Sequence, residues 1–126
     1  MKRCWLGFGL LLLLLTLSLV TTAMMTRIHE DTERDLTQSA QCALLGEWEN
    51  VDLFLRRAHR NWTKWAHFRS ALADHEPLED IDAAFEVLFV YRQARDATAY
   101  RAACVHLAKQ MAALGESHRP VWWNLL

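Results

Sequence analysis

Hydrophobic and polar residues divide the chain into an uncharged first segment and a longer amphipathic remainder. Residues 4–25 contain no Asp, Glu, Lys or Arg, and residues 10–15 are all leucine. A helix of these 22 residues is about 33 Å long, and the hydrocarbon core of a bilayer is about 30 Å thick. We therefore expect residues 1–25 to form an N-terminal membrane anchor.

A signal peptide is the alternative interpretation of this segment. Lys2 and Arg3 would be its charged start, residues 10–20 its apolar stretch, and residues 21–23 a weak cleavage site of small side chains. We favour an uncleaved anchor, because the apolar stretch is longer than a signal normally needs.

The charges on either side of the anchor predict its orientation. The short side carries Lys2, Arg3 and the amino terminus, whereas Arg27 and Arg34 on the long side lie among carboxylates. The excess of positive charge on the short side predicts a single-pass protein of the cell membrane. Its N-terminus would be cytoplasmic and its remaining residues extracytoplasmic.

Residues 26–119 show the periodicity of amphipathic helices. One helix would continue outward from the anchor and end at Gly46, since glycine accepts the left-handed backbone that ends helices. A long helix would then run from Glu47 to about Asp74. Its apolar positions recur at steps of three and four residues: Trp48, Val51, Leu55, Ala58, Trp62 and Trp65.

Pro77 divides this region into two halves. A third helix would start after Pro77, with carboxylates in its first turn that suit the helix dipole. Its predicted buried side comprises Ile81, Phe85, Leu88 and Tyr91. A break near Asp96 would lead to a fourth helix that stops at Gly115, and residues 120–126 form an apolar tail.

A weak internal repeat supports this division. Shifting the apolar stripe of the second helix by 49 residues places it on six further apolar positions: Ala97, Tyr100, Cys104, Leu107, Met111 and Leu114. The spacing differs from that of tetratricopeptide repeats, so the repeat bears on architecture alone. Together these patterns predict an all-α protein, in which a transmembrane helix is followed by an up-down bundle of about four helices arranged as two hairpins.

Two aromatic side chains in the tail have two interpretations. In an up-down bundle, the ends of the second and fourth helices lie nearest the bilayer. Trp122 and Trp123 follow the fourth helix, and tryptophan is enriched at membrane interfaces. In one interpretation, Trp122 or Trp123 contacts the membrane interface or the base of the bundle. In the other, the tail folds back and closes the core.

Cys42 and Cys104 are the cysteines outside the anchor. Both lie within about two turns of the same end of the predicted bundle, so a disulfide could form there if the first and fourth helices are neighbours. The favoured alternative makes Cys104 a small apolar side chain in the core, because it belongs to the buried stripe.

A basic run without carboxylates lies in the second helix. Arg56, Arg60 and Lys64 recur every four residues and share one face, and Arg69 follows them. This face could bind an acidic polymer, phosphate head groups or nucleic acid. We favour the alternative that it faces carboxylates of the third helix, namely Glu79, Asp82 and Glu86.

Composition argues against one function class, general binding of nucleic acid. The chain has 126 residues, of which 52% are hydrophobic, and a net charge of −1. A near-neutral chain gives no electrostatic basis for binding nucleic acid in general.

Motifs for chemistry are missing from the sequence. No two of the six histidines are four residues apart, and no Cys-x-x-Cys pair occurs, so we expect no metal and no cofactor. Neither a Gly-x-Ser-x-Gly elbow nor a glycine-rich phosphate loop is present. An enzyme would need a pocket with convergent polar groups, so we expect a protein that is not an enzyme.

The pattern as a whole resembles the domain of unknown function 4363 family of short bacterial proteins. The resemblance rests on the apolar anchor, the junction at residues 45–48 (Leu-Gly-Glu-Trp), the division near Pro77 and the closing residues 124–126 (Asn-Leu-Leu). It implies a membrane-anchored helical module and supplies no activity and no functional residue.

Two functional hypotheses follow. The first is a non-enzymatic helical interaction module, anchored in a bacterial membrane, whose partners are membrane lipid and another protein. The second is a binder of anionic cell-envelope material or lipid head groups through Arg56, Arg60, Lys64 and Arg69.

Overall fold

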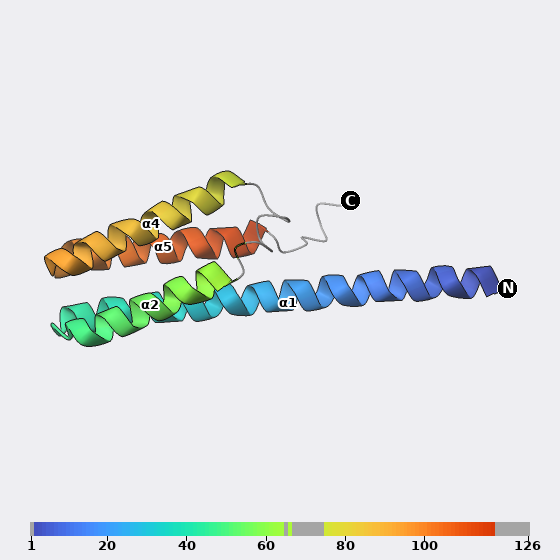
Figure 1. Cartoon of the computed structure of the whole chain (residues 1–126), viewed down its shortest axis with the longest axis horizontal. Helices are drawn as coiled ribbons and strands as arrows, with labels where there is room; N and C mark the ends of the chain where they lie inside the picture. The colour runs from blue at the N-terminus through green and yellow to red at the C-terminus, as the bar shows by residue number, and fades with distance from the viewer. Residues whose placement is uncertain (1, 65, 67–74, 118–126) are drawn as a thin grey trace.

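The computed structural model describes residues 2–64, 66 and 75–117, and within them the protein consists of four α-helices (Figure 1). These are α1 (Lys2–Leu44), α2 (Trp48–Lys64), α4 (His75–Ala94) and α5 (Ala97–Ser117). The described residues contain no strand, and the predicted all-α class is confirmed.

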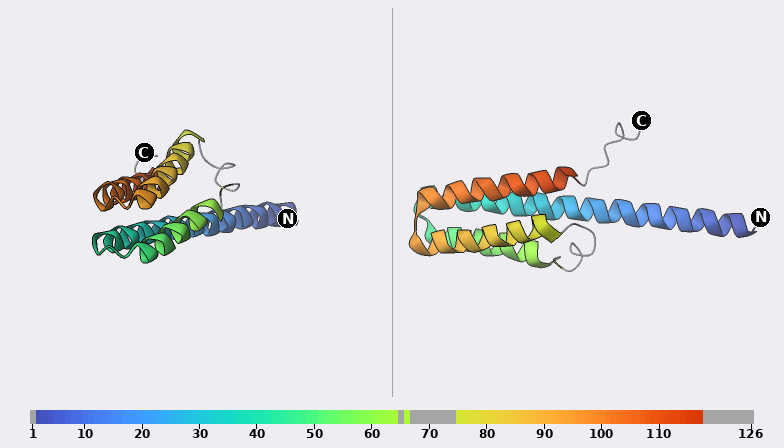
Figure 2. Two further views of the ribbon diagram at one scale, coloured as in Figure 1. Left: turned by 60° about the vertical axis from the view of Figure 1, so that its left-hand side comes forward. Right: turned by 90° about the horizontal axis from the view of Figure 1, so that it is seen from above.

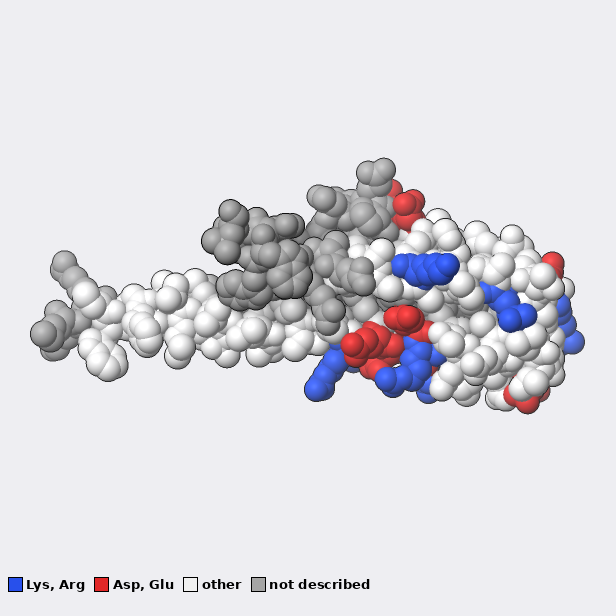
Figure 3. All heavy atoms as spheres, turned by 180° about the vertical axis from the view of Figure 1, so that it is seen from behind, with Lys and Arg blue, Asp and Glu red and all other residues white. Residues whose placement is uncertain are grey.

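α1 is the longest helix: its N-terminal part extends beyond the bundle, and its C-terminal part belongs to the bundle. Its Cys4–Leu44 part is long and apolar enough to cross a membrane. The N-terminal part extends well beyond the other helices (Figures 1 and 2). Its residues 4–25 carry no charged side chain, whereas charged side chains lie on the bundle (Figure 3). The hydroxyl groups of Thr16 and Thr22 donate hydrogen bonds to backbone carbonyls of the preceding turn, at 2.7 and 2.9 Å. Their polarity is therefore satisfied within the helix.

The four helices form two antiparallel hairpins. α2 returns alongside α1, α5 returns alongside α4, and both hairpin turns lie at the end farthest from the N-terminus (Figure 1). α1 packs against both α2 and α5, α4 packs mainly against α5, and α2 and α4 touch much less. The up-down arrangement is confirmed, with α1 and α5 as neighbours.

The α1–α2 turn confirms the predicted role of Gly46. This glycine has a φ of 73°. The N–H groups of Gly46 and Glu47 donate to the carbonyls of Ala43 and Cys42, at 3.3 and 3.0 Å. This pair of bonds satisfies carbonyls that the helix end would otherwise leave open.

The core consists mainly of the predicted apolar stripes. All four helices contribute to it, and its largest fully buried side chains include Trp62, Tyr100, Phe85, Leu36 and Leu55. Trp48, Tyr91 and Leu114, also predicted to be buried, pack at its edge.

Two predicted helix boundaries are wrong. α4 begins at His75 and includes Pro77 in its first turn, where the missing proline N–H would have no partner within the helix. α5 continues through Gly115 to Ser117. A Cβ atom on Gly115 would lie 3.4 Å from Nδ1 of His29, so this glycine allows close approach to α1.

Candidate functional site

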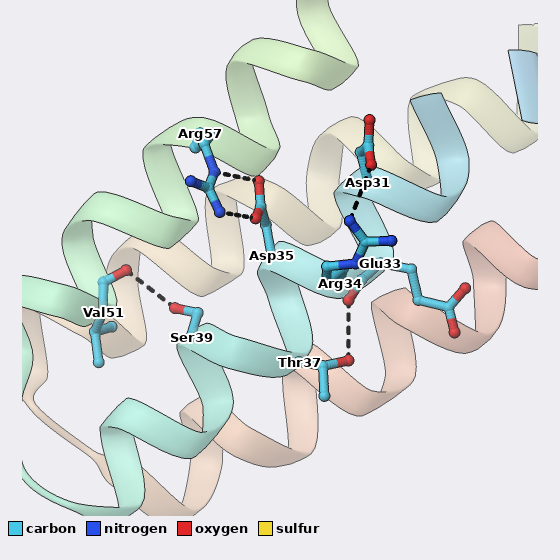
Figure 4. A network of polar contacts seen from close by, with 8 residues as sticks. All are labelled: Asp31, Glu33, Arg34, Asp35, Thr37, Ser39, Val51 and Arg57. Atoms are coloured by element: carbon cyan, nitrogen blue, oxygen red, sulfur yellow. Dashed lines mark hydrogen bonds and ion pairs between the residues drawn. The ribbon is translucent and has the colours of Figure 1, made fainter. Parts of the chain in front are cut away.

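An ion pair joins α1 to α2 in the middle of the bundle. The Arg57 guanidinium donates two hydrogen bonds to the carboxylate of Asp35, one of them from Nε to Oδ2 at 2.7 Å (Figure 4). The Asp35 side chain is 5% exposed and that of Arg57 46% exposed. The two-point contact sets the position of α2 along α1.

A buried hydroxyl network joins α1 to α2 and α5. The Ser39 hydroxyl donates to the carbonyl of Val51 at 3.0 Å, and the Tyr100 hydroxyl then donates to Ser39 Oγ at 2.6 Å. Burial raises the pKa of Tyr100 above its usual range, and it raises the pKa of the neighbouring Cys104 thiol to about 12. Both side chains therefore stay neutral at physiological pH.

Two polar contacts connect α2 to α4. Trp62 Nε1 donates to Oδ1 of Asp82 at 2.6 Å. Nη2 of Arg92 lies 2.9 Å from Oδ1 of Asp52. The contacts involve opposite ends of α2, so they hold α4 beside α2, although these two helices touch less than the other neighbouring pairs do.

A groove with a volume of about 380 Å³ lies between α1 and α5, and we name it the α1/α5 groove. Small side chains line part of it, larger apolar side chains project beside it, and charged groups of both signs occur on its walls. The residues that characterise it are Glu33, Ala40, Leu44, Val105, Ala108 and Lys109. Leu44 and Val105 are 58% and 53% exposed, which leaves apolar surface available for a partner.

The predicted basic face of α2 is open to solvent. Arg56, Arg60 and Lys64 are all exposed. Arg56 pairs with Asp52 of its own helix at 2.8 Å. For Arg56 and Arg60, the expectation that this face lies against carboxylates of α4 is wrong, because both are exposed and Asp82 accepts its hydrogen bond from Trp62. Arg69 lies outside the described residues.

Cys42 and Cys104 are free thiols, and the disulfide considered for them is not formed. Cys104 is 1% exposed and turns its sulfur toward Tyr100 in the core, as the alternative interpretation predicts. Cys42 is half-buried beside Glu47, and burial together with this carboxylate raises its pKa. Trp122 and Trp123 lie outside the described residues.

Among the residues that the structure describes, no group of three His, Cys, Asp or Glu side chains could hold a metal ion. Comparison with known proteins adds no further assignment, since no family model, curated protein or solved structure matches the chain. The resemblance to the domain of unknown function 4363 family stays a prediction.

Sequence reasoning did not identify the α1/α5 groove. Its residues lie beside the buried stripes, so the groove depends on which two helices become neighbours. Ala108 and Ala112, which both line the groove, are four residues apart and so share one face of α5. Two small side chains on a face beside the buried stripe are a weak sequence signal that another helix could approach there.

Proposed function

We propose that the protein is a membrane-anchored, non-enzymatic helical interaction module of a bacterial cell envelope, related to the domain of unknown function 4363 family. Residues 1–25 would span the membrane with the N-terminus in the cytoplasm, and the bundle would lie on the extracytoplasmic face. The observation that carries this proposal is the continuity of α1, a single helix that runs from the uncharged segment into the core of the bundle.

The register of the helices supports a bundle close to the membrane surface. His29 stacks near Trp62 of α2, with ring centroids 6.4 Å apart, and it also lies against Gly115 of α5. His29 is four residues beyond Met25, which corresponds to about 6 Å along the helix. The base of the bundle would thus lie at the head groups, and the α1/α5 groove would face sideways, toward other proteins of the same membrane.

The chemistry of the buried polar groups supports a role without catalysis. Asp35, Ser39 and Tyr100 are committed to contacts between helices. A thiol with a pKa of about 12, as burial gives Cys104, is a poor nucleophile near neutral pH. These groups stabilise the bundle and are not directed at a substrate.

A photo-crosslinking experiment tests the proposed module. A photoreactive amino acid at Val105, on the α1/α5 groove, should capture a protein in living cells. The matched control is Val87 on α4, which is 44% exposed and does not line the groove. Capture of lipid alone from both positions would contradict the proposal.

A second function, binding of anionic envelope material or lipid head groups, is favoured by one observation. The basic face formed by Arg56, Arg60 and Lys64 is exposed, and its last residue ends α2 at the base of the bundle. With Arg69, this face would meet anionic groups electrostatically.

A further inference from the structure

The two walls of the α1/α5 groove carry opposite charges. Glu33 lies on α1, and Lys109 and Arg101 lie on α5. Within the described part of the chain, none of these three side chains forms an ion pair. Glu33 points away from the neighbouring Asp35–Arg57 pair (Figure 4), so its charge is available to a partner.

Glu33 and Lys109 lie at the same level of the bundle. The close approach of His29 on α1 to Gly115 on α5 marks a common height on the two helices. Glu33 is four residues from His29, or about 6 Å along α1, and Lys109 is six residues from Gly115, or about 9 Å along α5. The two charges therefore differ in height by only about 3 Å.

The same surface also combines projecting and recessed apolar positions. Leu44 and Val105 are more than half exposed, and Ala40 and Ala108 line the groove beside them. A surface with both features can pack against a copy of itself, as an interface with two-fold symmetry requires.

We propose that the α1/α5 groove binds a second copy of this chain in a parallel dimer, with the two-fold axis along the membrane normal. This inference rests on the proposed function, since a common anchor gives all copies one orientation and one height. α1 of each copy then faces α5 of the other, and Glu33 of each meets Lys109 of the second copy. Packing α1 against α1 instead would oppose Glu33 to Glu33, which is unfavourable.

Charge-reversal variants of the full chain in liposomes test the dimer. Energy transfer between donor- and acceptor-labelled copies reports their association. Glu33→Lys and Lys109→Glu should each weaken association by about tenfold, because each change turns both intermolecular pairs into repulsive ones. Glu86→Lys on α4 makes the same change of charge on an exposed residue away from the groove, and it should leave association unchanged.

A mixture of the two variants gives the decisive result. When Glu33→Lys copies are mixed with Lys109→Glu copies, both pairs become attractive again, and association should return to near the wild-type value. If Glu33 and Lys109 acted within one copy, each variant would keep its own repulsion and mixing would restore nothing. An Ala112→Trp variant, which fills the groove, should also separate the copies.

The outcomes distinguish the dimer from the proposed function. A wild-type chain that remains in the liposomes as a monomer, or a mixture no better than its components, overturns the dimer alone. A chain recovered outside the liposomes overturns the anchor and, with it, the parallel dimer.

Discussion

Gly46 and Arg95 occupy equivalent positions in two turns of the same geometry. Both have a left-handed backbone, with φ angles of 73° and 53°. In each turn the following N–H group, that of Glu47 or Asp96, donates to a carbonyl five residues earlier, at 3.0 and 3.2 Å. The two positions are 49 residues apart, the period of the weak sequence repeat. The repeat therefore corresponds to two hairpins with the same turn.

Arg95→Gly should stabilise the protein. A side chain in the left-handed region costs about 1 kcal/mol, which glycine avoids. We expect the free energy of unfolding to rise by about 1 kcal/mol, measured by urea denaturation of the full chain in detergent micelles. Arg101→Gly, in the interior of α5, is the control and should lower it by about the same amount. Equal effects of the two substitutions would contradict the assignment of the turn.

Removing only one partner of the Asp35–Arg57 pair should lower the free energy of unfolding more than removing both. Arg57→Met leaves the buried carboxylate without its two-point partner, and we expect a loss of about 2–3 kcal/mol in the free energy of unfolding. The double variant Asp35→Leu/Arg57→Met removes the buried charge as well, so it should recover most of that loss. A double variant as unstable as Arg57→Met would show that the buried charge is not the cause.

Stability should fall at alkaline pH. Burial raises the pKa of Cys104 from 9.0 to about 12, so between these values the unfolded chain binds fewer protons than the folded one. The stabilisation is complete below pH 9 and is lost as the pH rises toward 12.

Cys104→Ala removes one titrating group and isolates this effect. Urea denaturation between pH 8 and pH 11 should show a wild-type decline steeper than that of Cys104→Ala by up to about 1.4 kcal/mol per pH unit. Parallel declines would mean that the thiol titrates alike in both states.

The exposed basic face predicts salt-sensitive binding of polyanions. If α2 binds anionic envelope material, the detergent-solubilised full chain should bind inorganic polyphosphate, and Arg60→Glu should weaken this binding by about tenfold. Raising the salt concentration from about 0.05 to 0.5 M should also weaken polyphosphate binding by the wild-type chain. Arg95→Glu, in the exposed turn between α4 and α5, serves as the charge-matched control. Binding that is indifferent to both salt and Arg60→Glu would exclude this face.

Local periodicity explains why the apolar core was predictable. Residues such as Val51, Leu55 and Leu107 recur at steps that can be recognised without knowing their neighbours in space. The buried polar residues were not predicted, because Ser39 and Asp35 find their partners 61 and 22 residues away. Their spacing with Thr32, Leu36 and Ala43 was nevertheless a usable signal, since all of them lie on the buried face of α1.

The basic face and the α1/α5 groove could not be predicted, because both depend on which helices are neighbours and the sequence does not determine this. The basic face was expected to be covered because α4 was placed along α2, whereas α4 packs mainly on α5. The α1/α5 groove has the same origin: periodicity identifies the buried face of each helix but not which two helices meet.

The state of the mature chain in the cell tests the proposed anchor most directly. Mass spectrometry of the membrane fraction should find a chain that still contains residues 1–25. In intact cells, a membrane-impermeant maleimide should label a Glu86→Cys variant on the exposed side of α4 more strongly than the parent chain. A soluble mature chain that lacks its first segment, or a cysteine at position 86 that reacts only after the cells are lysed, would contradict the account.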